Sequence, residues 1–319
     1  MSRVIVVGSY NQDHVWSSDA LPAPGATRLG RYASGPGGKG FNQAVASARV
    51  GAPTTFITAL GEDAAADIAR GVAADEGMEM RAELHAALPS GTAGIFVDGD
   101  GRNVIVVAPG ANAALSTGFI ACQAEDFAQA GVVLAQLEVN PDAVLAALRA
   151  GRAGGALTVL NPAPANAATT GALLDAADLL TPNETEFVAL LVRHAGVDIA
   201  ADALADMAPH ALHLLCRQLA PTATLVITLG AGGVFVSHGK DQTRGDGEVF
   251  YRLPCSPAKV VDTTGAGDAF NGALAARLAD GLNGTPFRAA VAFANTYAGW
   301  STELPGGAAS MRRLQGARQ

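Results

Sequence analysis

Residues 260–272 read Val260-Val261-Asp262-Thr263-Thr264-Gly265-Ala266-Gly267-Asp268-Ala269-Phe270-Asn271-Gly272, an apolar pair, a glycine-rich turn and the start of a helical pattern expected over 269–278. Gly265 and Gly267 have no Cβ, so the backbone can turn sharply there and bring its N–H groups close to a ligand. The first N–H groups of a helix have no intrahelical acceptor, and the positive end of the helix dipole lies beside them. The stretch therefore predicts an anion site that suits phosphate.

Asp268 is the unexpected residue in this stretch, because a carboxylate repels an anion. Its presence beside a phosphate site therefore suggests that it has a function. It could cap the helix, since Asp is a favoured N-cap residue. However, the string from Asp262 to Asp268 resembles the C-terminal signature of the PfkB carbohydrate kinases, the ribokinase-like family. That resemblance implies that Asp268 is the catalytic base and that the amides of Gly265, Ala266 and Gly267 form an anion hole.

A second glycine-rich motif, Gly35-Pro36-Gly37-Gly38-Lys39-Gly40, precedes a helix expected over 41–50. It satisfies the dinucleotide pattern Gly-x-Gly-x-x-Gly, but it follows a proline-rich segment rather than a strand, and Lys39 is followed by Gly40 instead of the Ser or Thr of a phosphate-binding P-loop. Taken whole, residues 37–46 resemble the N-terminal signature of the same PfkB family. The glycines would let a sugar lie against the backbone, while Lys39 and Asn42 offer hydrogen-bond donors.

The rest of the chain alternates between β-rich and helical segments. Short apolar strands are expected over 3–7, 54–60, 132–137, 157–160, 179–180 and 224–229, with polar residues at their carboxyl ends. This alternation predicts an α/β fold with a mostly parallel central sheet between two helical layers. Residues 92–97 and 104–107 flank Asp98-Gly99-Asp100-Gly101, a strong hairpin signal. The hairpin could belong to the edge of the main sheet, whereas the resemblance implies a small β lid over the sugar.

The composition excludes several classes of protein. The net charge is -8 with a pI near 5.2, which argues against a nucleic-acid or membrane-surface binder. The three cysteines, Cys122, Cys216 and Cys255, are few and widely spaced, so we expect a reducing, cytoplasmic location without a disulfide framework. No apolar run is long enough to span a bilayer. The 319 residues are interpreted as one catalytic domain with a lid formed by about 11–36 and 91–108.

The resemblance covers most of the chain and is closest to the ribokinase branch of the family. It implies transfer of the γ-phosphoryl group of ATP to the 5-hydroxyl of ribose, with Mg²⁺ bound to the nucleotide, K⁺ as an activator, and a homodimer formed through the lid. The residues expected to contact the sugar are Asn11, Asp13, Gly38, Lys39, Asn42 and Glu138. Those expected on the nucleotide side are Asn183, Glu186, Thr228, Gly230, Gly233 and Asn295. The expected monovalent-cation loop comprises Asp262, Thr264, Ser301, Leu304, Gly306 and Ser310.

Alternatives remain open for the cation site, for the acceptor and for the functional class. Leu304-Pro305-Gly306-Gly307 replaces the basic stretch common in ribokinases, so the binding of the monovalent cation is not secured by the resemblance. The acceptor could also be another sugar or nucleoside, such as deoxyribose, a ketose, pseudouridine or adenosine. A catalytically silent sugar-binding regulator on the same scaffold is the alternative from a different functional class.

Overall fold

A large twisted sheet forms the centre of the computed structural model, which describes residues 2–240, 242–279, 281 and 286–314. Its strand order is β13-β12-β11-β10-β9-β8-β1-β4-β5. The strands from β11 to β5 are parallel, and β12 and β13 pair antiparallel at one edge. The strands are β1 (Arg3–Val7), β4 (Thr54–Gly61), β5 (Glu79–His85), β8 (Ala130–Ala135), β9 (Leu157–Leu160), β10 (Leu179–Leu180), β11 (Thr224–Thr228), β12 (Val234–Ser237) and β13 (Phe250–Leu253).

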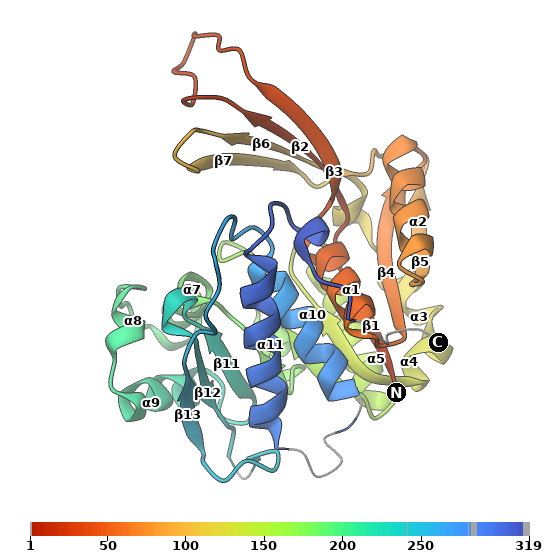
Figure 1. The fold of residues 1–319 in the computed structure, drawn as a ribbon. Coiled ribbons are helices and arrows are strands. Elements are labelled where there is room, and N and C mark those ends of the chain that lie inside the picture. The colour runs from red at the N-terminus through yellow and green to blue at the C-terminus, as the bar shows by residue number, and fades with distance from the viewer. Residues whose placement is uncertain (1, 241, 280, 282–285, 315–319) are drawn as a thin grey trace.

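Helices cover both faces of this sheet, because alternate strand residues point to opposite sides and both sides are apolar. In β1, Val4 and Val6 belong to one buried cluster, and Ile5 and Val7 belong to the other. The first cluster is completed by α1 (Lys39–Val50), α2 (Ala64–Asp75), α10 (Ala266–Ala279) and α11 (Phe287–Ser301), seen in front of the sheet in Figure 1. The second contains residues of α3 (Thr117–Ala121), α4 (Ala124–Ala128), α5 (Pro141–Ala153), α6 (Gly171–Asp175), α7 (Glu184–Ala195), α8 (Ala203–Asp206) and α9 (Pro209–Leu219). The predicted three-layer α/β fold is confirmed.

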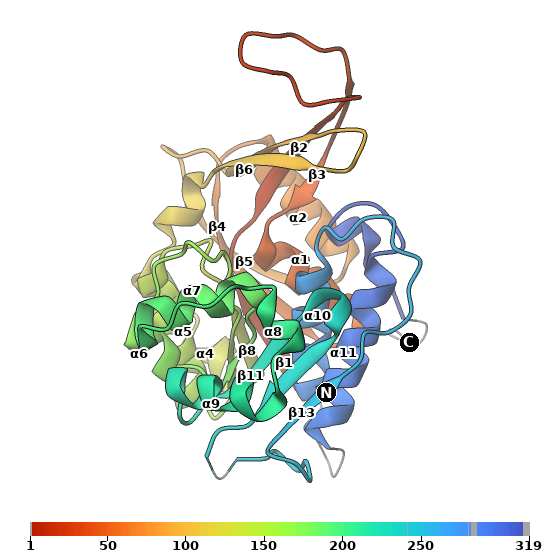
Figure 2. The ribbon, with the colours of Figure 1, turned by 90° about the vertical axis from the view of Figure 1, so that its left-hand side faces the viewer.

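A second sheet of four strands projects beyond one end of the large sheet (Figures 1 and 2). Its order is β3-β2-β6-β7, where the strands are β2 (Asn11–Ser17), β3 (Arg31–Gly37), β6 (Gly91–Val97) and β7 (Asn103–Ala108). The hairpin expected around Asp98 joins β6 to β7 in this sheet, so it is not an edge of the main sheet. Short 3-10 helices lie at Gly110–Ala114, Gly230–Gly232 and Ala308–Ser310.

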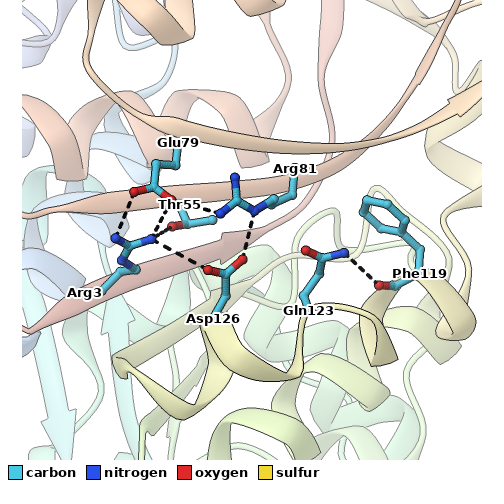
Figure 3. A network of polar contacts seen from close by, with 7 residues as sticks. All are labelled: Arg3, Thr55, Glu79, Arg81, Phe119, Gln123 and Asp126. Atoms are coloured by element: carbon cyan, nitrogen blue, oxygen red, sulfur yellow. Dashed lines mark hydrogen bonds and ion pairs between the residues drawn. The ribbon is translucent and has the colours of Figure 1, made fainter.

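An ionic network holds the edge strand β5, a strand that was not predicted from the sequence (Figure 3). Arg3 of β1 donates to Thr55 at 2.9 Å and to Glu79 of β5 at 2.7 Å. Arg81, also on β5, donates to Asp126 of α4 at 3.0 Å. These contacts hold β1, β4, β5 and α4 together at the end of the sheet where β1 begins.

Candidate active site

Asp268 lies in the first turn of α10, which begins at Ala266, three residues earlier than expected. Its carboxylate does not cap the helix. Instead Oδ2 accepts a hydrogen bond from Asn42 Nδ2 at 3.0 Å, and Oδ1 accepts one from Gln43 Nε2 at 2.9 Å. Burial raises the pKa of Asp268 above its ordinary value, against the lowering effects of the Lys39 charge and of the two amide donors. The carboxylate that the sequence singled out is thus buried and held on both oxygens.

The turn before α10 presents free backbone amides. Gly265 has φ +75°, and a Cβ at this position would lie 2.9 Å from the Cα of Gly307, so only glycine fits. The amide of Ala266 donates to Thr263 O at 3.2 Å. Within the described part of the chain, the amides of Gly265 and Gly267 have no acceptor. These two N–H groups are therefore available to an anion, whereas that of Ala266 already has an acceptor.

Asn11 and Asp13 lie in strand β2 of the small sheet, and their spacing of two places them on one face. Asn112 fixes the first of them: its Nδ2 donates to Asn11 Oδ1 and to Tyr10 O, both at 2.9 Å, while its Oδ1 accepts from Tyr10 N at 3.1 Å. Asn112 was not predicted from the sequence, because no local pattern signals a contact with a residue about a hundred positions away.

Three carboxylates converge on Lys39 near the start of α1. Glu138 accepts from Ser9 Oγ at 2.6 Å and from the Lys39 amide at 3.1 Å. Burial together with the charges of Glu138 and Asp268 raises the pKa of Asp13 to about 7. Burial alone would lower the pKa of the Lys39 ammonium, but the charges of Asp268, Glu138 and Glu186 outweigh it and raise that pKa. The expected sugar contacts and the expected base therefore occupy one region, with Gly38 as the N-cap residue of α1.

A polar cavity of about 150 Å³ lies beside Asp268, and Lys39, Glu186, Thr228 and the glycine turn line it. Asn183 and Glu186 form a capping box at the start of α7: Asn183 Oδ1 accepts from the Glu186 amide, and Glu186 Oε2 accepts from the Asn183 amide, both at 2.9 Å. The capping role was not recognised in the sequence, although the Asn-x-x-Glu spacing fits it. Burial raises the pKa of Glu186 above its ordinary value, although the Asn183 amide and Lys39 oppose the rise.

A larger and more apolar cavity of about 440 Å³ continues from the first, because Asn183, Thr228 and Gly267 line both. Its other walls include Gly230 and Gly233 on the β11–β12 side and Asn295 on α11. Asn295 Nδ2 donates to Pro254 O at 2.7 Å, which fixes the orientation of this amide. All six residues expected on the nucleotide side thus line one of the two connected cavities.

The expected cation loop is held together by hydrogen bonds. Asp262 accepts from the Thr264 amide at 2.9 Å and from the Gly306 amide at 2.8 Å. Burial would raise the pKa of Asp262, but these hydrogen bonds outweigh it and lower that pKa. Ser301 is buried and donates to Ala298 O, Ser310 is buried and donates to Gly307 O, and Leu304 is half exposed. Among the residues that the structure describes, no group of three or more His, Cys, Asp and Glu side chains could hold a metal ion.

A chain of buried amides runs beside the polar cavity, and no local sequence pattern predicted it. Gln136 donates to Gln43, and Gln43 donates to both Asp268 and Asn161. Asn161 donates to the carbonyl of Thr181, whose hydroxyl donates to Asn271. Asn271 Nδ2 then donates to Gly267 O at 2.8 Å. The proposed base and the peptide of the glycine turn are therefore anchored to one buried network.

Comparisons with known proteins identify relatives of this chain. The model of the pfkB family carbohydrate kinases matches residues 1–313. The chain is 36% identical over 312 residues to the ribokinase of Haemophilus influenzae, covering 97% of this chain and 95% of that protein. It is 38% identical over 282 residues, 87% of this chain, to the bifunctional ribokinase/ribose-5-phosphate isomerase A of Fructilactobacillus sanfranciscensis, but spans only 49% of that longer protein.

A solved structure has the same fold. The ribokinase of Arabidopsis thaliana, complexed with ribose and ATP, superposes with a TM-score of 0.81 at 28% identity, covering 98% of this chain and 96% of that one. No helix in the described ranges is long and apolar enough to cross a membrane. With a family model that matches nearly its whole length, the chain belongs to the pfkB family of carbohydrate kinases.

Proposed function

We propose that this protein catalyses the ATP-dependent phosphorylation of ribose at its 5-hydroxyl group. The similarity to proteins named ribokinase supports this assignment. The observation that carries it is the 3.0 Å hydrogen bond between Asn42 and Asp268, which lie 226 residues apart. This contact joins the two signature motifs, so a sugar held by the first would present a hydroxyl to the acid of the second.

The sugar end of the site offers matched hydrogen-bonding groups. Asn42 Oδ1 is buried and has no donor among the residues that the structure describes. Because a buried acceptor without a partner is costly, a sugar hydroxyl would supply the missing donor. Asn11 and Asp13 would contact the sugar from β2, with Gly38, Lys39 and Glu138 closing the other side. Asp268 would then accept the proton of the attacking hydroxyl, and its raised pKa makes it a stronger proton acceptor.

The part of the site that would hold the phosphates provides positive charge and hydrogen-bond donors. This is expected where positioning and electrostatics dominate catalysis. The free amides of Gly265 and Gly267 would meet the charge that develops on the transferred phosphoryl group. Lys39 lines the same cavity and would approach the phosphates. Asn183 and Glu186 are the residues that would hold Mg²⁺, which neutralises phosphate charge when bound. The capping box uses Oε2 of Glu186, and its other oxygen would serve the metal or a metal-bound water.

The apolar cavity would hold the nucleoside of ATP, with Thr228, Gly230 and Gly233 on one wall and Asn295 against the base. Its volume of about 440 Å³ lies within the range of ordinary small-molecule sites.

K⁺ would be held by oxygen atoms of the loop around Asp262, since K⁺ prefers carbonyl and other oxygen ligands. The residues that would supply these oxygens are Asp262, Thr264, Ser301, Leu304, Gly306 and Ser310. Asp262 is partly buried, and hydrogen bonds that include the one from the Gly306 amide lower its pKa and favour the carboxylate. The 304–307 segment also contacts the glycine turn through Gly307, so an ordered loop would support the free amides.

The small sheet would serve as a lid over the sugar and as the surface through which two copies associate. Val104, Ile105, Val106 and Val107 are all about half exposed or more, so both faces of β7 are apolar and uncovered. Contiguous apolar surface of this kind marks an interaction site. Sedimentation analysis of the protein and of Val106→Asp tests this, with a dimer expected for the first and a monomer for the second. Because ATP is available in the cytoplasm, the proposal places the enzyme there.

A coupled assay of ADP release over a panel of acceptors tests the assignment. We expect ribose to give a higher kcat/KM than deoxyribose, fructose, pseudouridine or adenosine. A higher value for one of the others would reassign the substrate within the family. Sugar binding without phosphorylation of any acceptor would instead support the regulator, against which the buried Asp268 and the free amides argue.

A further inference from the structure

Gln43 contacts the carboxylate oxygen of Asp268 that Asn42 does not contact, and its side chain is fully buried. Its Nε2 donates to Asp268 Oδ1 at 2.9 Å and to Asn161 Oδ1 at 3.1 Å. Both hydrogens of the amide are thereby used. Asn42, by contrast, contacts the other carboxylate oxygen and keeps an unpartnered acceptor of its own.

The orientation of the Gln43 amide is set by its neighbours. Gln136 Nε2 donates to Gln43 Oε1, so this oxygen must point away from Asp268. Asn161 uses its own Nδ2 to donate to Thr181 O at 2.9 Å, which leaves its Oδ1 as the acceptor facing Gln43. A flipped Gln43 would place its oxygen against the carboxylate of Asp268 and against Asn161 Oδ1. Asn161, whose own orientation is set by Thr181 O, and the carboxylate of Asp268 therefore exclude the flip, and Gln136 Nε2 supplies the donor for the Gln43 oxygen.

We infer that Gln43 is a positioning residue for phosphoryl transfer: it fixes the rotation of the Asp268 carboxylate and stabilises its ionised form, with Gln136 locking the amide of Gln43 in the donating orientation. The part of this inference that concerns the rate of phosphoryl transfer rests on the proposed function. The chemistry is that of a hydrogen bond to an anion, which favours the charged form of the acid.

Other charged groups act on Asp268 from the elements around it. Lys39 at the start of α1 favours the ionised carboxylate. Glu138 after β8, Glu186 on α7 and Asp13 on β2 are acidic groups of the same region, and Asp13 becomes charged as the pH rises through about 7. Because all four remain in a Gln43 variant, the effect of losing this one donor can be measured against a constant background.

The test compares Gln43→Met, which keeps the length of the side chain but removes both donors, with the unaltered enzyme. A hydrogen bond to a charged group changes an equilibrium by roughly tenfold to a hundredfold, so we expect kcat to fall by about that factor. The acidic limb of the kcat profile should move upward by about one to two pH units, while KM for ribose changes less than about threefold. Gln136→Met should shift the limb in the same direction by less, because Gln43 is retained.

Ser47→Ala is the matched control, since Ser47 is fully buried one turn further along α1 and bonds Thr54 instead of the site. An unchanged pH profile in a folded Gln43→Met enzyme overturns the inference. A second measurement needs no activity: urea unfolding of Gln43→Met, Asp268→Asn and the double variant at pH 8. Non-additive free energies support the contact, and additive ones overturn it. If the protein phosphorylates no sugar but the cycle is non-additive, the proposed function fails while the positioning contact stands.

Discussion

Asp13 should make the protein less stable as the pH rises, and Asp13→Asn should remove that dependence. Burial and two neighbouring carboxylates raise the pKa of Asp13 from 3.8 to about 7 in the folded protein. Between these values the unfolded chain has lost the Asp13 proton while the folded protein keeps it. The stability linked to Asp13 is therefore complete below about pH 4 and is lost as the pH rises through 7.

The magnitude follows from the size of this shift. A difference of about three pKa units corresponds to a loss of about 4 kcal/mol above pH 7. Close to 2 kcal/mol of that loss has already occurred at pH 5, because the unfolded chain is ionised there. Between pH 5 and pH 8, the free energy of unfolding of Asp13→Asn should therefore rise relative to the unaltered protein by about 2 to 3 kcal/mol.

Urea unfolding of the two proteins at several pH values, without sugar, measures this difference. Other titrating groups contribute to both proteins and largely cancel. Asp75→Asn is the control, since Asp75 is an exposed carboxylate at the end of α2. A stability difference that does not change with pH would refute the reasoning. Asp13→Asn should also lower the affinity for ribose by about tenfold to a hundredfold, because Asp13 is expected to contact the sugar. Asp13 would thus lower the stability of the folded protein and contribute to sugar binding.

Three further outcomes are expected. Asp268→Asn should lower kcat by about a thousandfold while ribose still binds in calorimetry; activity within tenfold of the unaltered enzyme would remove Asp268 as the base. Replacing K⁺ by Na⁺ at constant ionic strength should lower kcat, and equal rates in both salts would exclude a selective site in the loop around Asp262. Gly307→Ala should raise KM for ribose and lower kcat, because the added Cβ would lie 2.9 Å from Asn42 Nδ2; Gly171→Ala, where a Cβ meets nothing within 4 Å, is the control, and similar kinetics of the two variants would contradict this.

The elements that were predicted correctly carry strong local signals. Val4 to Val7 form an unbroken apolar run, as expected of a strand that is buried on both faces, and Asp98 to Gly101 favour a tight turn. Strand β5 has charged residues at Glu79, Arg81 and Glu83, and its ion pairs lie with distant parts of the chain, so no local pattern identified it.

The site was predictable where motif and chemistry coincide, and not where it depends on distant contacts. The proximity of Asp268 to Asn42 follows from packing of α1 against α10, which a sequence alone does not specify. Gln43 stands inside a recognised motif, yet its bond to Asp268 depends on the same packing. Likewise, the bond from the Ala266 amide to Thr263 depends on where α10 begins. The helix was expected to begin three residues later, so this bond was not predicted.

The junction between the two sheets gives Asn11 a mechanical role as well as a chemical one. Asn11 is the first residue of β2, and it pairs with Gly37 at the end of β3 and with Gly91 at the start of β6. The connections that precede β2, follow β3 and precede β6 therefore lie beside Asn11, whose side chain is expected to bind the sugar. A rotation of the small sheet about this row of residues would turn Asn11 with it. If the small sheet closes over a bound sugar, the orientation of Asn11 and the position of that sheet would therefore be coupled.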